Sequence, residues 1–281
     1  MDVPISFTKA SGAGNDFIIV NNMAGDLDID CGRFAVAVCD RHFGVGGDGL
    51  LVIGKSNRAD FAMAYYNADG SSGGMCGNGG RCIARFALEG GVARKNQRFE
   101  ALDHIYAAEV GEKSVRLHMK DPVDFRTGLV FSHGGVSMKG AFIDTGAPHA
   151  VIFEDDLESL DVMKLGKAVR HDPRFDPAGT NVNFVRIRDG STVELRTYER
   201  GVESETLACG TGSVASALVA SDLHGLPSPV TVAVMSGEKL LVHFRKTGST
   251  WAEVILEGGA YMLFKGKLLY LEDQSIIRVV P

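Results

Sequence analysis

Residues 65–88 read YYNADGSSGGMCGNGGRCIARFAL, and this stretch decides the prediction of the fold. It begins with the end of an apolar run typical of a β-strand. A turn rich in glycine and serine follows, and the stretch ends in a segment with helical composition. Cys76 stands between the turn and the helix predicted over 80–88, in the sequence Cys-Gly-x-Gly. The stretch therefore predicts a strand, a polar turn and a helix, with a cysteine beside the helix start.

The same order of segments returns in the second half of the chain. Residues 192–197 alternate polar and apolar side chains, a polar turn follows, and a second Cys-Gly-x-Gly at Cys209 precedes a helix predicted over 211–223. Segments rich in asparagine precede each cysteine, at 14–17 and at 180–184. We therefore predict an α+β fold of two pseudo-symmetric domains, each a mixed or antiparallel sheet around a central helix, with both cysteines in the cleft between them.

The break between the two halves is expected near Asp121–Pro122. The predicted boundaries are 1–121 for an N-terminal domain that carries Cys76, 122–266 for a C-terminal domain that carries Cys209, and about 267–281 for a last strand that returns to the N-terminal domain. Two further helices are predicted, over 32–41 and 157–169.

Composition excludes several classes of protein. The 281 residues carry a net charge of −6, so the chain lacks the basic face that nucleic-acid binding needs. No apolar run reaches the length of about 18 residues that a membrane helix requires, and no secretory signal is recognisable at the N-terminus. The 5 cysteines are odd in number and include no C-x2-C pair, which argues against a disulfide framework or a structural zinc site. We expect reduced thiols in the cytoplasm and no metal.

The matched settings of Cys76 and Cys209 predict a chemical role. A cysteine thiol has a pKa of about 8.5, and the amides and dipole of a helix start favour the thiolate. The same amides can hold a carboxylate. Two such sites facing one amino acid would exchange its α-proton, because one thiolate removes the proton and the opposite thiol returns one. Buried cysteines are usually structural, and that interpretation is kept for Cys31, Cys39 and Cys82.

Eight motifs follow one another in order from residue 9 to about residue 266. They are Lys9-x4-Gly14-Asn15-Asp16-Phe17, Asn67-Ala-Asp-Gly-Ser, Met75-Cys-Gly-Asn-Gly-Gly-Arg-Cys82, Gly146-x-Pro148-His149, Gly179-Thr-Asn-Val-Asn-Phe184, Tyr198-Glu-Arg-Gly201, Glu205-Thr-Leu-Ala-Cys-Gly-Thr-Gly212 and Glu257-Gly258-x-Ala260. In content and order these motifs resemble those of diaminopimelate epimerases.

The resemblance implies a role for each matched position. Cys76 and Cys209 would be the two acid/base residues of a cofactor-independent epimerase that interconverts LL- and meso-diaminopimelate for lysine and peptidoglycan synthesis. The residues implied to assist them are His149 and Glu199, near the cysteines; Gly77, Asn78, Gly210 and Thr211, on the α-carboxylate; and Asn15, Asn67, Asn181, Glu199 and Arg200, on the rest of the substrate. The partner would be a small diamino diacid, and family members are often dimeric, so a homodimer is also implied.

Some positions depart from the pattern of the family. Ala147 stands where the family often has asparagine, and Gly49 where it has glutamine or glycine, so the contacts to the distal end of the substrate differ. The run from Gly44 to Gly49 matches the dinucleotide motif G-x-G-x-x-G, but a predicted helix precedes it and a strand follows it. That order is the reverse of what the motif needs, so we interpret the run as a turn.

Two other functions remain open from the sequence. The first is a related cysteine-pair enzyme that acts on proline or hydroxyproline, although a small apolar ring has no distal carboxylate for Arg200 to bind. The second is a binding or redox module in which Cys76 and Cys209 form a disulfide. Loss of turnover in either Cys→Ser variant, with the fold retained, would separate an epimerase from the second.

Overall fold

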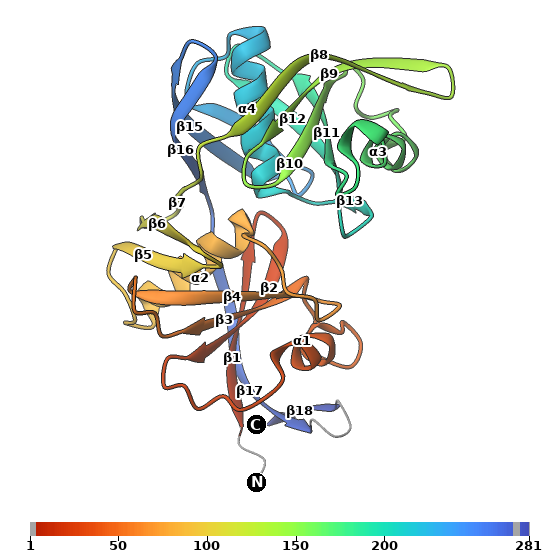
Figure 1. Ribbon diagram of the computed structural model, residues 1–281. Helices are drawn as coiled ribbons and strands as arrows, with labels where there is room; N and C mark the ends of the chain where they lie inside the picture. Colours follow the sequence, from red (N-terminus) through yellow and green to blue (C-terminus); the bar gives the residue numbers. More distant parts are fainter. Residues whose placement is uncertain (1–3, 272–275, 281) are drawn as a thin grey trace. The chain divides into compact units, whose positions relative to one another are not determined.

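The computed structural model describes residues 4–271 and 276–280, which divide into two compact units (Figure 1). The first unit comprises Met1–Leu117 and Gly259–Pro281, and the second comprises His118–Gly258. The sequence placed the return to the first unit near residue 267, but β17 (Tyr261–Leu271) pairs with β1 (Ile5–Gly12) from Tyr261 onward. The crossing therefore comes at Gly258–Gly259, where β16 (Thr250–Gly258) ends.

The first unit is built on a mixed sheet. β17 pairs antiparallel with β1, β1 antiparallel with β2, β2 parallel with β3, β3 antiparallel with β4, and β4 parallel with β5. β5, β6 and β7 continue as antiparallel neighbours, and β18 pairs antiparallel with β17. The bounds are β2 Asn15–Asn22, β3 Gly49–Gly54, β4 Phe61–Asn67, β5 Asn96–Ala101, β6 His104–Val110, β7 Val115–His118 and β18 Ile276–Val280.

The second unit repeats this order of pairings. β8 and β9 pair antiparallel, as do β9 and β10; β10 and β11 are parallel, β11 and β12 antiparallel, and β12 and β14 parallel. β14, β15 and β16 continue antiparallel, and the short β13 pairs with β12. The bounds are β8 Val123–His133, β9 Val136–Asp144, β10 Pro148–Phe153, β11 Asn181–Ile187, β12 Thr192–Glu199, β13 Ser204–Thr206, β14 Val230–Ala233 and β15 Lys239–Thr247.

Each sheet surrounds one buried helix. In the first unit α2 (Gly77–Glu89) contacts β1, β2, β3, β6 and β17. In the second unit α4 (Gly210–His224) contacts β9, β10, β11, β12, β14, β15 and β16, and all its side chains from Gly210 to Ser221 are buried. The predicted fold class is confirmed: an α+β fold in which two similar units each wrap a mixed sheet around a central helix.

The two smaller helices each cover the outside of a sheet. α1 (Cys31–Cys39) packs on β3 and β4, and α3 (Val162–Arg170) packs on β11 and β12. The sequence started α3 five residues too early, at Leu157. The helix begins later because the Asp161 carboxylate accepts a hydrogen bond from the Lys164 amide at 3.0 Å and caps it there. α1 likewise ends at Cys39, two residues before the predicted end.

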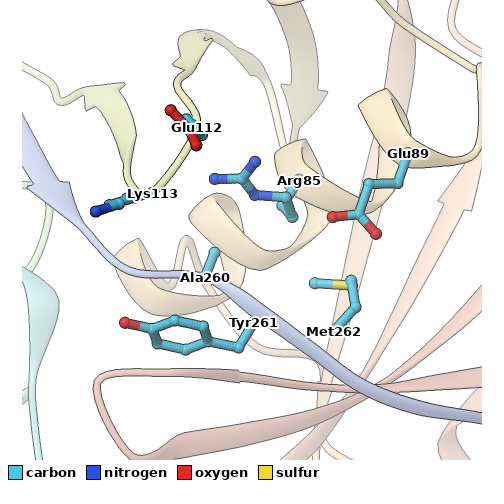
Figure 2. A pocket seen from close by; sticks show the side chains of 7 residues that line it. All are labelled: Arg85, Glu89, Glu112, Lys113, Ala260, Tyr261 and Met262. Atoms are coloured by element: carbon cyan, nitrogen blue, oxygen red, sulfur yellow. The ribbon is translucent and has the colours of Figure 1, made fainter.

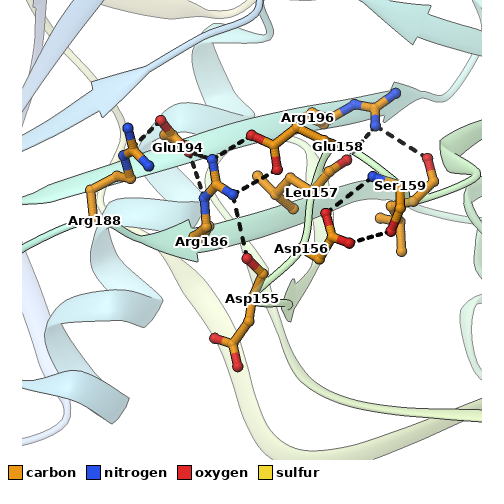
Figure 3. A network of polar contacts seen from close by, with 10 residues as sticks. Asp155, Asp156, Leu157, Glu158, Ser159, Arg186, Arg188, Glu194 and Arg196 are labelled. Carbon is orange, nitrogen blue, oxygen red and sulfur yellow. Dashed lines mark hydrogen bonds and ion pairs between the residues drawn. The ribbon is translucent and has the colours of Figure 1, made fainter.

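A network of ion pairs covers the outer face of β11 and β12 (Figure 3). The Arg186 guanidinium pairs with Glu158 at 2.7 Å and with Glu194, which also accepts from Arg188 at 2.8 Å. Beside it, the Arg196 guanidinium donates to two carbonyl oxygens in 157–160, the loop that precedes α3. The network therefore ties this loop to the sheet, on the face away from α4.

Candidate active site

Cys76 is the N-cap residue of α2, at the exit of a polar turn that follows β4. Its backbone is extended (φ −101°), and its sulfur accepts a hydrogen bond from the Gly79 amide at 3.4 Å. Glycine allows close packing at this helix start, since a Cβ added to Gly80 would lie 2.5 Å from the Met75 side chain. The glycines therefore let the first turn of α2 pack closely, with the Gly79 amide on the cysteine sulfur.

Asn15 and Asn78 lie against Cys76. The Cys76 sulfur is 3.6 Å from Asn15 Oδ1, and Asn78 Nδ2 is 3.4 Å from the same oxygen. The amide of Asn15 has one orientation, because its Nδ2 donates to the Asp48 carboxylate at 2.5 Å. The amide of Asn78 is fixed as well, because its Oδ1 accepts from the buried Arg81 guanidinium at 2.9 Å.

Asp48 belongs to a charged cluster behind Asn15. The Arg41 guanidinium lies 2.8 Å from both Asp48 and Asp16, and the Lys9 ammonium lies 2.7 Å from Asp16. Burial alone would raise the pKa of Asp16, but hydrogen bonds from Arg41 and Lys9 outweigh it and lower that pKa to about 2. Asp16 therefore stays ionised at neutral pH, and the cluster holds the turn from 44 to 49 against β2.

Strand pairing brings Asn67 to the same end of the sheet as Asn15. Gly49 opens β3 and lies between Phe17 of β2 and Asn67, the last residue of β4. A Cβ at Gly49 would lie 2.5 Å from the Tyr65 ring, so glycine is the residue that fits here. The Asn67 side chain donates to the Ser71 hydroxyl at 2.9 Å. The run from 44 to 49 precedes β3 with φ +80° at Gly46, as expected of a turn.

Cys209 is the N-cap residue of α4, in the same position as Cys76 on α2. Its backbone is extended (φ −112°), and its side chain is buried, with 7% exposed. The Cys209 sulfur lies 3.5 Å from the Thr211 hydroxyl in the first turn of the helix. The two cysteines thus occupy equivalent places in the two units, each at the start of a buried helix.

His149 connects the start of α4 to β11. Its Nε2 lies 2.9 Å from the Thr211 hydroxyl, and its Nδ1 lies 3.1 Å from Asn183 Nδ2. His149 is fully buried, and burial, with a smaller contribution from the charge of Arg200, lowers its pKa to about 3. The imidazole is therefore neutral at neutral pH, and it bridges two side chains rather than carrying a charge.

The remaining predicted residues of the second unit lie at the adjacent ends of β11 and β12. Asn181 Oδ1 accepts from the Arg200 amide at 2.8 Å, and Asn181 Nδ2 donates to the Pro148 carbonyl at 3.0 Å. Glu199 accepts from the Thr206 hydroxyl at 3.0 Å. The Arg200 guanidinium donates to the Ala178 carbonyl at 3.5 Å, and within residues 4–271 and 276–280 it has no carboxylate partner.

The sequence reasoning missed three residues that hold these groups: Asp48, Asn183 and the side chain of Thr211. Asn183 could have been found from the spacing Asn-Val-Asn, because residues 181 and 183 point to the same face of a strand. Asp48 had no such signal, since its contact with Asn15 depends on the pairing of β2 with β3.

Figure 2 shows a pocket of the first unit that holds none of the predicted site residues. It lies between α2 and the start of β17, and charges of both signs line it. Its lining residues are Arg85, Glu89, Glu112, Lys113, Ala260, Tyr261 and Met262. Within the described ranges no cluster of His, Cys, Asp and Glu is arranged to hold a metal ion, and no helix has the length and apolar character to cross a membrane.

Comparison with known proteins finds a match to one protein family. The model of the family described as "Diaminopimelate epimerase" matches residues 7–123 and 141–263, which include both cysteine motifs. The chain belongs to the diaminopimelate epimerase family. A diaminopimelate epimerase of Chlorobaculum tepidum is 46% identical over 262 residues, covering 92% of this chain and 99% of that protein. One of Aquifex aeolicus is 41% identical, covering 94% and 98%.

Solved structures share the fold of this family member at low sequence identity. A phenazine biosynthesis protein of the PhzF family from Bacillus anthracis superposes with a TM-score of 0.76 at 14% identity, covering 95% of this chain and 99% of that one. A hydroxyproline epimerase from Agrobacterium vitis gives 0.69 at 15% identity, covering 97% and 95%. At such identities these similarities establish the two-unit fold alone.

Proposed function

We propose that this protein interconverts LL- and meso-diaminopimelate by moving one α-proton between Cys76 and Cys209, without a cofactor. The observation that carries the proposal is the repeated N-cap cysteine: each unit sets one thiol at the start of a buried helix. Family membership supports the choice of substrate, because the relatives that match over nearly their whole length are diaminopimelate epimerases.

The mechanism requires the two sulfurs to meet opposite faces of the α-carbon. The thiolate of one cysteine takes the α-proton, so the Cα–H bond breaks and an S–H bond forms. The thiol of the other cysteine then gives its proton to the carbanion from the other face, which inverts the centre. The amides of Gly77, Asn78, Gly210 and Thr211 would hold the α-carboxylate, where negative charge accumulates in the transition state.

Arg200, Asn15, Asn67 and Asn181 would bind the distal end of the substrate. The planar guanidinium of Arg200 suits a carboxylate, and it has no such partner among the described residues. Asn15, Asn67 and Asn181 place amide oxygens and nitrogens at the strand ends near the cysteines, where an ammonium and a carboxylate can both find partners. Glu199 lies at the end of β12 beside Arg200 and would pair with the ammonium.

The test is a comparison of substrates. The purified, reduced protein is incubated without added cofactor with LL-diaminopimelate, and in parallel with L-proline and trans-4-hydroxy-L-proline, and the products are separated by chiral chromatography. We expect meso-diaminopimelate and no change in either proline. Epimerised proline or hydroxyproline without turnover of diaminopimelate would overturn the proposal in favour of a proline-type enzyme.

We also propose that the enzyme acts in the cytoplasm as a homodimer. A reaction that depends on two reduced thiols fits a reducing compartment. Tyr261 and Leu263 project from one face of β17 and are 49% and 54% exposed, which makes this face a candidate contact between copies. Light scattering of the wild type and of Leu263→Lys tests the dimer: a monomeric wild type would overturn it.

A further inference from the structure

Two guanidinium groups of the second unit donate to the same oxygen. Arg170, the last residue of α3, places its Nη1 3.2 Å from the Ala178 carbonyl oxygen. Arg200, which follows the last residue of β12, places its Nη1 3.5 Å from that oxygen. A carbonyl oxygen has two lone pairs and can accept both bonds. The two cations are therefore neighbours, although they come from different elements.

Gly179 allows the chain to close around Arg170. Its φ is +67°, a conformation that side chains other than glycine rarely adopt. A Cβ at this position would collide with Arg170 Nη1 and would lie 2.6 Å from the Arg170 carbonyl oxygen. The glycine that opens the motif 179–184 thus lets the Ala178 carbonyl reach the Arg170 guanidinium.

Glu203 supplies a carboxylate to Arg170 and not to Arg200. Glu203 Oε1 accepts from Arg170 Nε at 3.1 Å and from the Gly201 amide at 3.0 Å, and Oε2 accepts from the Tyr198 hydroxyl at 3.3 Å. The His171 ring lies farther away, at 3.9 Å. Burial alone would raise the pKa of Glu203, but the Gly201 amide and the charge of Arg170 outweigh it and lower that pKa. Glu203 is therefore ionised at neutral pH.

Glu203 also closes the turn that carries Arg200. Its backbone is left-handed (φ +56°), and its amide donates to the Glu199 carbonyl at 2.8 Å while its carboxylate holds the Gly201 amide. A non-glycine residue in this conformation needs such contacts to hold it. The Arg200 amide is held from β11, because it donates to Asn181 Oδ1 at 2.8 Å. The backbone is thus fixed on both sides of Arg200.

We propose that Arg170 and Glu203 are positioning residues that hold the Arg200 guanidinium for the distal carboxylate of the substrate; this rests on the proposed function. Arg170 and Glu203 neutralise each other, whereas no carboxylate among the described residues pairs with Arg200. One positive charge is left uncompensated, and it belongs to the residue whose backbone is held. A substrate with a second carboxylate supplies the missing negative charge.

The exposure of the pair indicates where its effect should be measured. The side chains of Arg170 and Glu203 are 14% and 41% exposed, so solvent screens their attraction and the pair should contribute little to stability. Repulsion between Arg170 and Arg200 on one oxygen is offset as long as Glu203 is in place. Loss of Glu203 should therefore act mainly on substrate binding.

The test measures KM and kcat for LL-diaminopimelate in full-length variants. Glu203→Ala should raise KM about tenfold and change kcat less than about threefold, because Arg200 binds the distal end and not the reacting carbon. Glu203→Gln keeps an oxygen that can accept from Gly201 and Arg170, and it should raise KM less than about threefold.

The matched control is Glu194→Ala. Glu194 is also a carboxylate of the second unit that pairs with arginine, in its case Arg186 and Arg188 on the outer face of the sheet (Figure 3). Its loss removes one negative charge and two ion pairs without touching the turn of Arg200. The KM of this variant should equal that of the wild type.

A pure effect of charge would have the opposite sign. Removing a carboxylate makes the surroundings of Arg200 more positive, which on its own would lower the KM for a dicarboxylate in Glu203→Ala and Glu203→Gln alike. A rise in KM that is larger in the alanine variant than in the glutamine variant is therefore specific to positioning.

A second measurement asks whether Glu203 acts through Arg200. In the Arg200→Lys background the guanidinium held at the Ala178 carbonyl is absent, so Glu203→Ala should change KM by less than about twofold. Thermal midpoints are recorded for every variant. If Glu203→Ala does not fold, Arg170→Met removes the same pair from its other end, and its effect on KM should likewise disappear in the Arg200→Lys background.

An unchanged or lower KM in Glu203→Ala, an equal rise in Glu203→Gln, or the full tenfold rise in the Arg200→Lys background would overturn the inference. A wild type that epimerises LL-diaminopimelate but gives one of these results contradicts the inference alone. A wild type that does not epimerise LL-diaminopimelate contradicts the proposed function, and the inference with it.

Discussion

At the residue scale, the site depends on side chains whose partners fix their orientation. Asn15, Asn78 and Asn183 each have one amide orientation, set by Asp48, by Arg81 and by the Ala150 carbonyl. Arg200 is the exception, because its backbone amide is held by Asn181 while its guanidinium has no ion-pair partner among the described residues. The asparagines are therefore held in place by their partners, whereas the proposed contact of Arg200 with the substrate rests on a guanidinium that no carboxylate in the described ranges holds.

Replacing Arg200 by lysine tests its role in binding. Lysine retains the charge but loses the two-point geometry that fits a carboxylate, so the KM for diaminopimelate should rise about 10- to 100-fold, or about 1.5–3 kcal/mol. The thermal midpoint should stay within about 2 °C of the wild type, since the backbone contact with Asn181 remains. An unchanged KM in steady-state kinetics would remove Arg200 from the site.

The buried neutral His149 predicts a dependence of stability on pH. Its folded pKa of about 3 lies below the value of about 6.5 in the unfolded chain, so below pH 6.5 the unfolded chain binds one more proton. The free energy of unfolding should therefore fall as pH falls from 6.5 toward 3, by about 1.4 kcal/mol per pH unit from this residue.

Urea denaturation at pH 6.5 and pH 5, on the wild type and on His149→Asn, measures that contribution. Between these pH values the wild type should lose about 2 kcal/mol more than the variant. Equal losses in the two proteins would mean that His149 is not the residue responsible.

At the element scale, strand ends and helix starts build the site in each unit. β2, β3 and β4 end together at Asn15, Gly49 and Asn67, and β10, β11 and β12 repeat the arrangement. The first turn of each central helix packs against these ends through glycine. At Gly212 the Asn183 oxygen would lie 2.4 Å from an added Cβ, so this glycine is needed for Asn183 to approach α4.

Gly212→Ala should therefore destabilise the protein, although alanine is the better helix former by about 1 kcal/mol. We expect a loss of about 1–3 kcal/mol in the free energy of unfolding, because Asn183 is displaced by an oversized neighbour. Gly54→Ala is the control, since a Cβ there meets nothing within 4 Å. A variant of Gly212 as stable as wild type would show that Asn183 has room to move.

The ion pairs of the second unit should differ in how much they stabilise the fold, according to how deeply they are buried. Arg196 is 18% exposed and holds Glu205 as well as two loop carbonyls, so Arg196→Met should cost about 1–3 kcal/mol of stability. Arg245 and Glu253 are 62% and 67% exposed, and Arg245→Met should change stability by less than about 0.5 kcal/mol. Chemical denaturation of the two variants measures the difference, and equal costs would contradict this account.

At the scale of the whole molecule, the repeated order of strands and helices could be predicted because each half carries the same local pattern around its cysteine. The start of α3 was predicted less accurately. The N-cap at Asp161 sets where the helix begins, and Leu157 packs in the core without being part of the helix. The return of the chain at Gly259 was placed late because pairing with β1, a contact distant in sequence, decides it.

Candidate site residues were predicted where a sequence motif contains them, and they were missed where only strand pairing in the fold brings them to the site. Cys76, Cys209 and the residues next to them were chosen as candidates from their sequence motifs. Asp48 could not be chosen in this way, because its contact with Asn15 arises from strands that come together only in the folded chain, whereas Asn183 was missed although the spacing Asn-Val-Asn carries a signal for it. Positions that orient a catalytic group are harder to recognise than the group itself for this reason.

The most direct test of the central claim follows the α-proton. The reduced wild type, Cys76→Ser and Cys209→Ser are each incubated with LL-diaminopimelate in heavy water, without cofactor, and the products are analysed by chiral chromatography and mass spectrometry. The two-thiol account predicts meso product with one solvent deuterium at the inverted α-carbon from the wild type, and no meso product from either variant. Meso product that retains the original hydrogen, or turnover by a single-thiol variant at the wild-type rate, would contradict it.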